Sequence, residues 1–495
     1  MKFKKRELVL VVILVLVLAL KIYFVAQVAM PSYDSFFAER QIDSIKDSGK
    51  PLHFDPLSYQ GRTHVGNGFF YYALAVLSII VPSLILFKYI AVVLGIIALV
   101  FIFLITKKLF PARWVGILVT TLAALSPSLF SFSLNEVTPG ILFFVLYLIL
   151  IYSFMQIDSK PNAIVAFLVT FVIAAFTSSL ILGFALGAGI YFVLLRLEFL
   201  PIKKREFELL FFSGIFAFWY YILLFKKLFT GGVQALWGGI PKELLADYFS
   251  GMTVPLALSL VGFVPMLLGF YAIYMVLFTE RNRKLLLLVS LAFSWGLLTW
   301  LGFIPFKEGI IFGTVTLALL SAYTINKATS YLKKTKLSFM RPVLAISLLV
   351  LVLIAFIPVF SYVGVIKQGT PTPQELETMV FIKENTPEDA TILGTIQDGH
   401  IINAVAERKN FFDEQFLFAP QAQQRYDDAK KVFFTRSEVV AKQVFRTYLI
   451  DYVYISTNTE RVYAEQNLFE ESTCFENVFE TEQTKVYEFT CKGNT

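Results

Sequence analysis

Charged residues are scarce in this sequence, and cysteine is almost absent. Only 16% of the 495 residues are charged, whereas 57% are hydrophobic and the mean hydropathy is +0.69. A soluble globular protein of this length is excluded, because so much apolar surface exceeds what its core would bury. Apolar runs of about twenty residues, long enough to cross a hydrocarbon layer of roughly 30 Å, recur up to about residue 366. The composition therefore predicts a polytopic α-helical membrane protein.

Several familiar motifs are also missing. The sequence contains no CxxC pair, Walker loop or GxGxxG signature, and it has no internal repeat or low-complexity linker. The net charge of +7 arises mainly from short loops between apolar runs, not from one soluble face. The basic excess thus indicates membrane topology, and we predict no nucleic-acid partner.

The apolar runs predict about eleven transmembrane helices. The first run, Leu8 to Met30, is longer than the core of a usual signal peptide and contains Lys21, so we expect an uncleaved span. With the basic N-terminus in the cytoplasm, nearly every short basic loop falls on the cytoplasmic side. The expected spans are residues 7–30, 84–106, 113–134, 138–155, 161–178, 180–196, 207–226, 253–278, 285–303, 309–327 and 342–363.

The stretch from Gly68 to Val81 is apolar but only fourteen residues long. Counting it as a crossing would spoil the charge pattern, so we interpret it as an interfacial or re-entrant helix on the outer side. Three larger segments then face outward: residues 31–83, 227–252 and the tail after about 366. The 227–252 segment has the composition of a mobile loop that closes over substrate, and equally that of an interfacial anchor.

The chain is expected to divide into a transmembrane domain, residues 1–366, and an extracytoplasmic α/β domain, residues 367–495. In the tail, Thr372-Pro-Gln-Glu375 predicts a capping box that opens a helix to about Asn385. Helices and strands then alternate, which favours a small three-layer domain closed by a hairpin. The expected strands are 391–396, 451–456, 473–479 and 485–491, and the expected helices are 400–406, 420–434 and 436–448.

Cys474 and Cys491 are the only cysteines, and they lie equidistant from the centre of the turn at 481–484. In a regular hairpin they would face one another at a Cα separation of about 4.5 to 5.5 Å, within reach of a disulfide. An outward domain in an oxidising compartment makes this pairing plausible, and two free thiols are the alternative.

Acidic and basic side chains gather at the outer ends of several spans. Asp34 follows the first span, Glu136 lies beside Asn135 at the end of the third, and Lys307 lies between the ninth and tenth. A single acid near a membrane end is usually just solvated. Three such sites beside a long outer loop favour a shared catalytic site in which Asp34 and Glu136 act as acids or bases.

Other residues are candidates for binding substrate. Lys307 is the strongest candidate for holding an anionic group, although a cation snorkelling at a helix end is an equal alternative. Lys88 and Arg62 are weaker candidates. Arg40 and Asp55 lie in the same outer loop, and Arg40 could instead pair along its helix with Glu39 or Asp43.

The three histidines and one lysine have less definite interpretations. His53 and His64 flank Asp55, but their spacing indicates loop polarity and not a metal site. His400 is expected to begin a helix. Lys21 lies within the first span, where a charge is rare; it either faces a lipid-carrier groove or reaches the headgroups.

At these residues the sequence resembles the GT-C membrane glycosyltransferases, most closely the catalytic subunits of oligosaccharyltransferases. The 31–77 region is similar to their first outer loop, with Asp34, two aromatics and Arg40, followed by DPLSY at 55–59 and an aromatic helix at 69–72. SLNEVTPG at 133–140 is similar to their second acidic site. The segment FIKENTPEDATILGTIQDGHIINAVAERKNFFDEQ at 381–415 resembles the start of their outer domain.

The resemblance implies transfer of a sugar from a polyprenyl-phosphate-linked donor to a protein, lipid or glycan acceptor on the outer face of the cell membrane, with inversion at the anomeric carbon. An oxocarbenium-like transition state needs a carboxylate for the acceptor proton, for which Asp34 is the candidate, and a cation for the departing phosphate. Asp34 and Glu136 could also hold Mg²⁺ or Mn²⁺.

The sequence departs from that family in three places. Ala38 stands where a His is frequent, Glu136 follows Asn135 where two separated carboxylates are expected, and Thr395 to Gly399 replaces the tryptophan-rich motif that holds an acceptor sequon. The last departure favours transfer of a single sugar over en bloc transfer by an oligosaccharyltransferase. A lipid transporter and a non-catalytic glycan-export protein remain as alternatives outside catalysis.

Overall fold

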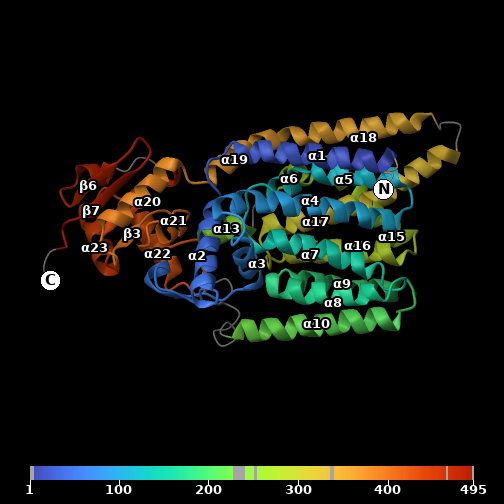
Figure 1. Cartoon of the computed structure of the whole chain (residues 1–495), viewed down its shortest axis with the longest axis horizontal. Helices are drawn as coiled ribbons and strands as arrows, with labels where there is room; N and C mark the ends of the chain where they lie inside the picture. Colours follow the sequence, from blue (N-terminus) through green and yellow to red (C-terminus); the bar gives the residue numbers. More distant parts are fainter. Residues whose placement is uncertain (1–4, 227–239, 250–252, 335–338, 464–466, 493–495) are drawn as a thin grey trace.

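The computed structural model describes residues 5–226, 240–249, 253–334, 339–463 and 467–492. A bundle of long helices forms one end of an elongated molecule, and a β-sheet with flanking helices forms the other (Figure 1). Helices α2 (Tyr33–Ser48), α3 (Phe69–Leu77) and α13 (Lys242–Phe249) lie between the two parts. These three helices therefore form the junction between the bundle and the sheet region.

Each expected span coincides with a helix or a pair of helices within the described ranges. Five of these helices are long and apolar enough to cross a membrane, or six if one bent pair is a single span. The others are shorter, most of them with 10 to 17 residues, whereas the helices at 127–132 and 254–261 have six and eight. The bundle consists of α1 (Lys5–Ala26), α4 (Ser83–Leu109), α5 (Arg113–Ala124), α6 (Pro127–Phe132), α7 (Pro139–Phe154), α8 (Asn162–Thr177), α9 (Ile181–Leu197), α10 (Lys204–Leu224), α14 (Val254–Val261), α15 (Phe263–Phe278), α16 (Arg283–Trp300), α17 (Phe306–Lys334) and α18 (Met340–Phe356).

Three expected spans are wrong as single α-helices, and one of them, 342–363, changes after Phe356 to a 3₁₀ helix at Ile357–Ser361. The 113–134 span ends at Ala124 and resumes at Pro127 as the short α6, because proline is favoured in the first turn of a helix but not within one. The 253–278 span is bent by 97° between α14 and α15. Gly262 lies at that bend with φ 87°, a left-handed conformation that glycine adopts without strain.

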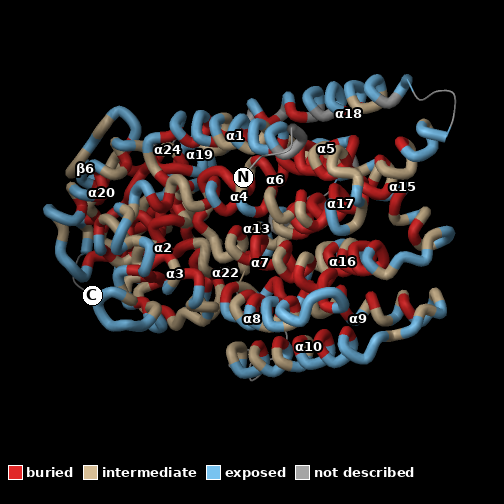
Figure 2. The backbone as a smooth tube through the Cα atoms, turned by 45° about the vertical axis from the view of Figure 1, so that its right-hand side comes forward, coloured by how far each residue is buried: buried red, intermediate tan, exposed pale blue. Residues whose placement is uncertain are grey.

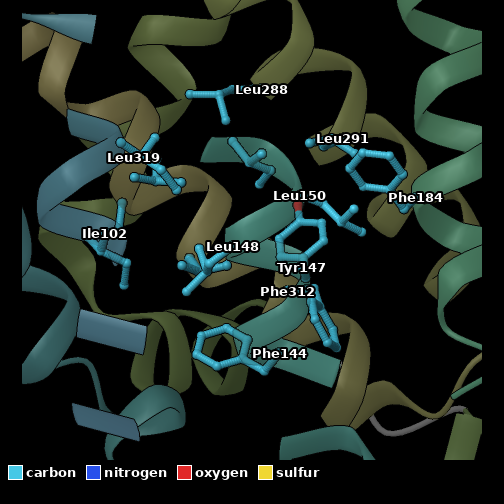
Figure 3. Close-up of a cluster of buried hydrophobic side chains, with 14 of the residues drawn as sticks. Ile102, Phe144, Tyr147, Leu148, Leu150, Phe184, Leu288, Leu291, Phe312 and Leu319 are labelled. Atoms are coloured by element: carbon cyan, nitrogen blue, oxygen red, sulfur yellow. The ribbon is translucent and has the colours of Figure 1, made fainter. Parts of the chain in front are cut away.

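Aromatic and aliphatic side chains from α4, α7, α9, α16 and α17 pack together in the centre of the bundle (Figure 3). The ring of Phe312 on α17 meets that of Tyr147 on α7 at 5.3 Å between centroids, and Trp295 on α16 donates a hydrogen bond from its indole nitrogen to Tyr147. Outer helices such as α18 are instead largely exposed (Figure 2), and their exposed residues include the apolar Ile346 and Leu353. Exposed apolar surface of this extent fits contact with lipid.

Lys21 is buried within the bundle and not directed at solvent. Its ammonium group donates hydrogen bonds to the carbonyl of Phe130 at 2.9 Å and to the hydroxyl of Ser133 at 2.6 Å, and it lies over the Phe130 ring. The sequence predicts that Lys21 faces a lipid-carrier groove or reaches the headgroups, and neither prediction accounts for these contacts. Through these hydrogen bonds Lys21 connects α1 to the end of α6 and to Ser133, three residues before Glu136.

The apolar stretch at 68–81 forms the short helix α3 over most of its length. The nine residues of α3 span about 14 Å at 1.5 Å per residue, too little to cross a bilayer. It packs through Phe70 and Leu74 on Phe37 and Ile42 of α2. Between α2 and α3 the chain forms a small hairpin of β1 (Phe54–Asp55) and β2 (Arg62–Thr63), with a 3₁₀ turn at Ser58–Gln60.

The C-terminal sheet has the strand order β4-β3-β5-β7-β6. Strands β4, β3 and β5 are parallel, whereas β7 and β6 run antiparallel to their neighbours. The strands are β3 (Thr391–Leu393), β4 (Lys409–Asn410), β5 (Tyr452–Ile455), β6 (Phe475–Glu480) and β7 (Lys485–Phe489), and the helices are α19 (Tyr362–Gln368), α20 (Pro373–Asn385), α21 (Gly399–Ala404), α22 (Ala422–Phe434), α23 (Glu438–Tyr448), α24 (Thr457–Tyr463) and α25 (Asn467–Glu471).

This sheet is covered on both faces, as the alternation of elements predicted. One face, with Leu393 and Val453, packs on α22 and α23, and the other, with Ile392 and Tyr454, packs on α20 and α21. The capping box at the start of α20 is present between Thr372 and Glu375. The sequence missed the two-residue strand β4 and the short helices α24 and α25.

Cys474 and Cys491 form a disulfide with a Cα separation of 5.1 Å. It closes the open end of the β6–β7 hairpin, although a register shift between Asn477 and Phe479 makes Phe475 face Phe489. The cross-link therefore joins residues just beyond the paired strands.

The 31–83 segment is built into the C-terminal region. Tyr33 and Phe36 of α2 belong to the hydrophobic cluster on one face of the sheet, and Tyr59 belongs to the cluster on the other. The Tyr59 amide donates to Asn410 at 2.8 Å, and its hydroxyl donates to the carbonyl of Asp413 at 2.7 Å. These contacts hold the 31–83 segment against both faces of the sheet and against the loop that follows β4.

Candidate active site

A polar cavity of about 310 Å³ lies at the junction of the bundle and the sheet region. Several parts of the chain meet there: the start of α2, α6 and the segment after it, the start of α17, the end of α19 with the residues that follow it, and the loops after β3 and β4. The cavity, called the polar cavity below, is lined by Ser32, Tyr33, Asp34, Ser131, Asn135, Glu136, Lys307, Ile366, Gly369, Thr370, Gln397 and Glu414.

Asp34 lies in the first turn of α2, after the cap residue Ser32. An acid is favoured there because the unpaired amides and the dipole of a helix N-terminus stabilise negative charge. Next to it, the Tyr33 amide donates to the carbonyl of Gly369 at 3.3 Å, and the Tyr33 hydroxyl donates to Glu375 at 3.1 Å. These bonds hold the half-buried Asp34 side chain at the wall of the polar cavity.

Glu136 and Lys307 form an ion pair across this cavity. Glu136 precedes α7, whose first turn begins at Pro139, and Lys307 belongs to the first turn of α17. Although it is paired, the Lys307 side chain keeps 67% of its surface accessible, against 20% for Glu136. Lys307 therefore has donor capacity left for an anionic ligand.

His400 and Glu414 join Asp34 in a cluster of three. One ligand atom of each side chain lies within 4.8 Å of the others. His400 is buried, and its Nε2 atom has no hydrogen-bond partner among the described residues. Two carboxylates and an imidazole whose nitrogen lacks a partner are a fitting donor set for a divalent cation.

Gly399 allows the loops that carry His400 and Glu414 to approach. A Cβ atom at this position would lie 2.5 Å from the carbonyl oxygen of Phe412 and 2.6 Å from the Cβ of Asp413. Only glycine fits so close an approach of two backbone segments. The contact brings the start of α21 against the loop after β4.

The pKa values of Glu414 and of its neighbour Asp413 are shifted in opposite directions. Burial raises the pKa of Glu414, and the nearby carboxylates of Asp34 and Asp413 raise it further. Burial alone would also raise the pKa of Asp413, but His400, Arg62 and hydrogen bonds from Ser58 and Asn410 hold it below its usual value. Asp413 thus stays ionised, while Glu414 favours a proton or a bound cation.

The structure distributes the predicted site residues between two roles. Asp34, Glu136 and Lys307 meet around the polar cavity, but the metal pair Asp34 and Glu136 is not the cluster that forms. Glu136 is held by Lys307, and His400 and Glu414 take the places beside Asp34. His400 does begin α21, as expected, but the sequence did not indicate its partners.

The other four predicted substrate-binding residues have partners elsewhere, and none of them lines the polar cavity. Arg40 forms a two-pronged ion pair with the buried Asp55, which also accepts from the amides at 57 and 58. Arg62 donates to the carbonyl of Gln415. Lys88 donates to the carbonyl of Val28 at 2.8 Å and so caps the end of α1. We interpret these contacts as structural, because each charged group is paired with another group of the protein and none faces the polar cavity.

An apolar cavity of about 860 Å³ lies nearby among α14, α15, α16 and α17. Its wall includes Phe306 and Ile310 at the start of α17, the aromatic residues Phe270 and Trp300, and Gly313. Phe306, which lines the apolar cavity, and Lys307, which lines the polar cavity, are consecutive residues, so both cavities reach the N-terminus of α17. The bend at Gly262 contributes to this space by turning α14 away from the line of α15.

The helical bundle, the 31–83 segment packed on it and the sheet region together have a fold similar to that of a solved oligosaccharyltransferase and of ArnT, in agreement with the resemblance seen in the sequence. No protein-family model and no curated protein matches the sequence.

Three solved structures carry this comparison. The Archaeoglobus fulgidus oligosaccharyltransferase in its apo form has a TM-score of 0.67 and 17% identity, covering 95% of this chain and 73% of that one. The Archaeoglobus fulgidus oligosaccharyltransferase AglB in complex with an inhibitory peptide and a dolichol-phosphate has a TM-score of 0.66 and 14% identity, covering 94% and 72%. ArnT from Cupriavidus metallidurans, bound to undecaprenyl phosphate, has a TM-score of 0.55 and 11% identity, covering 97% of both chains. The likeness extends over nearly the whole chain and concerns the fold.

Proposed function

We propose that this chain is an integral membrane glycosyltransferase that transfers a sugar from a polyprenyl-phosphate-linked donor to a protein, lipid or glycan acceptor. The proposal includes eleven transmembrane spans, a cytoplasmic N-terminus and an extracytoplasmic C-terminal domain from residue 367. This orientation puts the polar cavity at the outer face of the membrane, where a lipid-linked donor and a water-soluble or surface-bound acceptor can both arrive.

The observation that carries the proposal is that Lys307, which lines the polar cavity, directly follows Phe306, which lines the apolar cavity. The carboxylates of Asp34, Glu136 and Glu414 line the polar cavity as well. A polyprenyl-phosphate-sugar has the same three parts in order: an apolar chain, a phosphate and a polar sugar. Its chain would occupy the apolar cavity, its phosphate would contact Lys307, and its sugar would enter the polar cavity.

The same residues suit the chemistry of transfer. Cleavage of the bond between the anomeric carbon and the phosphate leaves negative charge on the phosphate, which the ammonium of Lys307 stabilises. A carboxylate on the opposite side takes the proton of the acceptor, and Asp34 is our candidate for this base. Attack from the face opposite to the leaving phosphate inverts the anomeric carbon. Glu136 keeps Lys307 oriented through their ion pair.

A divalent cation fits the cluster of Asp34, His400 and Glu414, because the two carboxylates and the unpartnered Nε2 atom of His400 supply three ligand atoms. Bound there, a cation would stabilise the phosphate as a Lewis acid. Mg²⁺ and Mn²⁺ accept carboxylate oxygens readily, and the imidazole nitrogen suits Mn²⁺ or Zn²⁺ better than Mg²⁺.

A transfer assay tests the proposal. Purified protein in lipid nanodiscs is incubated with polyprenyl-phosphate-sugars extracted from the native membrane, and both transfer and release of free sugar are measured. Asp34→Asn is expected to lower the rate by about 10²- to 10⁴-fold, the usual contribution of general acid–base catalysis. Asp47→Asn, at the exposed far end of the same helix, is the matched control. Wild-type turnover by Asp34→Asn would refute the assignment of the base.

En bloc transfer of an oligosaccharide to protein is the second candidate, favoured by the likeness to an oligosaccharyltransferase over 95% of this chain. Mass spectrometry of surface glycoproteins and glycolipids from a deletion strain separates the two. Truncated glycans indicate a single-sugar enzyme, and unmodified asparagines indicate en bloc transfer.

A further inference from the structure

A second cavity adjoins the polar cavity on the side of the C-terminal sheet. Its volume is about 300 Å³, and Gln397 and Glu414 line both cavities. The rest of its wall comes from α13, α22, α24 and the loop after β3. Two molecules held in these adjoining cavities would meet at the Glu414 carboxylate, close to Asp34.

One wall of this second cavity is supplied by α13, which comes from between α10 and α14. The helix is tied to α22 by two contacts at its start. The amide of Lys242 donates to the Gln423 side chain at 2.8 Å, and Glu243 forms an ion pair with Lys430 at 2.5 Å. Leu244, the next residue, faces the cavity. The wall is therefore attached to the C-terminal region and gives the cavity a defined shape.

The wall has a mixed aromatic and polar character without a cation. Among the described residues that line it, Glu414 is the only one with an ionisable acidic or basic side chain of the Asp, Glu, Lys, Arg or His type. A phosphorylated or carboxylated ligand would find no counter-ion there, so the chemistry favours an uncharged one. Tyr426 and Tyr463 contribute aromatic rings, Ile396 and Val462 contribute aliphatic surface, and Thr395 and Gln397 contribute polar groups.

These features match a sugar ring better than a peptide. A sugar presents C–H groups on its faces and hydroxyls at its edge, and tyrosine likewise combines an apolar ring with a polar tip. The volume lies at the lower end of the range of about 300–1,000 Å³ for small-molecule pockets. A peptide strand would seek an open sheet edge, but β3, which leads into the cavity wall, is paired with β4 and β5 on its two sides.

We propose that the second cavity is an acceptor subsite for an uncharged sugar residue, so that the acceptor of this enzyme is a glycan hydroxyl. The inference rests on the proposed function. In the transfer step the acceptor oxygen forms a bond to the anomeric carbon of the donor sugar. The bond from that carbon to the phosphate oxygen breaks and its electron pair leaves with the phosphate. The hydroxyl proton passes to the Asp34 carboxylate.

The test measures binding of sugars to the full-length protein in nanodiscs, without a sugar-based detergent. Saturation-transfer NMR is recorded with methyl glycosides of glucose, galactose, mannose and N-acetylglucosamine, and with an uncharged blocked tripeptide of Asn, Ala and Thr. Val462→Trp fills the cavity, and Val439→Trp on α23 is the matched control. Both valines are exposed, at 52% and 74%, so neither substitution disturbs a core.

The expected result is a signal from at least one glycoside that falls at least fivefold in Val462→Trp and stays within twofold of wild type in Val439→Trp. Equal signals in the two variants, no glycoside signal at all, or a cavity-dependent signal from the tripeptide instead would each overturn the proposal. The readout needs neither donor nor turnover. Cavity-dependent sugar binding without transfer would therefore keep the subsite and refute the proposed transferase, whereas transfer without such binding would do the reverse.

Discussion

Lys307 at the start of α17 is paired with Glu136 from the segment before α7, and it directly follows Phe306 in the wall of the apolar cavity. Lys307 belongs to α17 and Glu136 lies just before α7, and these two helices pack together in the centre of the bundle. A charge held there is preorganised for a phosphate that arrives from the apolar side.

Removing this charge is expected to weaken donor binding. Charge-assisted hydrogen bonds contribute about 1.5–3 kcal/mol, so Lys307→Ala should raise KM for the polyprenyl-phosphate-sugar by about 10- to 100-fold. Lys307→Arg should recover part of the loss because it retains the charge. Lys334→Ala, at the exposed far end of α17, serves as the control in steady-state kinetics. An unchanged KM in Lys307→Ala would contradict the placement of the phosphate.

The three-residue cluster is expected to bind a divalent cation without help from Glu136. After treatment with chelator, addition of Mn²⁺ or Zn²⁺ should raise the Tm of the wild-type protein, since a ligand at 100 times its Kd stabilises the folded state by about 2.7 kcal/mol. His400→Ala and Glu414→Gln should abolish the rise, and Glu136→Gln should preserve it. The opposite pattern would restore the pair of Asp34 and Glu136 as the metal site.

Gly399 is expected to be intolerant of substitution. In Gly399→Ala the added methyl group overlaps the Phe412 carbonyl, and relieving such overpacking costs about 1–3 kcal/mol. Separation of the two loops should weaken the cation-induced rise in Tm as well. Gly189→Ala is the control, because a Cβ on Gly189 meets no atom within 4 Å. Unchanged stability and cation response in Gly399→Ala would show that the loops do not need this approach.

His64 is expected to make the protein sensitive to acid. Burial, reinforced by Arg62, lowers the pKa of His64 from 6.5 to about 4. Between these values the unfolded chain binds a proton that the folded chain does not, so the contribution of His64 to stability is complete above pH 6.5 and is lost as the pH falls towards 4. The loss amounts to about 3 kcal/mol at most.

Thermal unfolding of His64→Gln and of the exposed control His53→Gln, each measured from pH 4 to pH 7.5, tests this expectation. The difference in Tm between wild type and His64→Gln should shift in favour of the variant as the pH falls. Parallel Tm curves for wild type and His64→Gln would show that protonation of His64 is not linked to unfolding.

The elements of this fold were predictable wherever one local signal dominated. Apolar length located the helices of the bundle, and the capping box located the start of α20. The break before Pro127 and the 97° bend at Gly262 were missed, because hydropathy averages over a window and does not register a single backbone angle. The strand β4 was missed because two residues carry no periodicity.

The candidate site was predictable only in part, for a similar reason. Asp34, Glu136 and Lys307 stand out because charge is rare at the ends of apolar runs. His400 and Glu414 lie in a polar tail with no motif that links them, and only their three-dimensional proximity to Asp34 distinguishes them. Arg40 and Asp55 are residue types that are typical of a binding site, but they form an ion pair with each other.

The buried ammonium of Lys21 has a consequence for biosynthesis. Its two oxygen partners belong to residues made more than a hundred positions later in the chain. A cation in hydrocarbon without partners is costly, so the first helix cannot settle at its final depth when it leaves the ribosome. It must wait near the headgroups, or beside the translocation machinery, until the turn after α6 arrives and lets it sink into place.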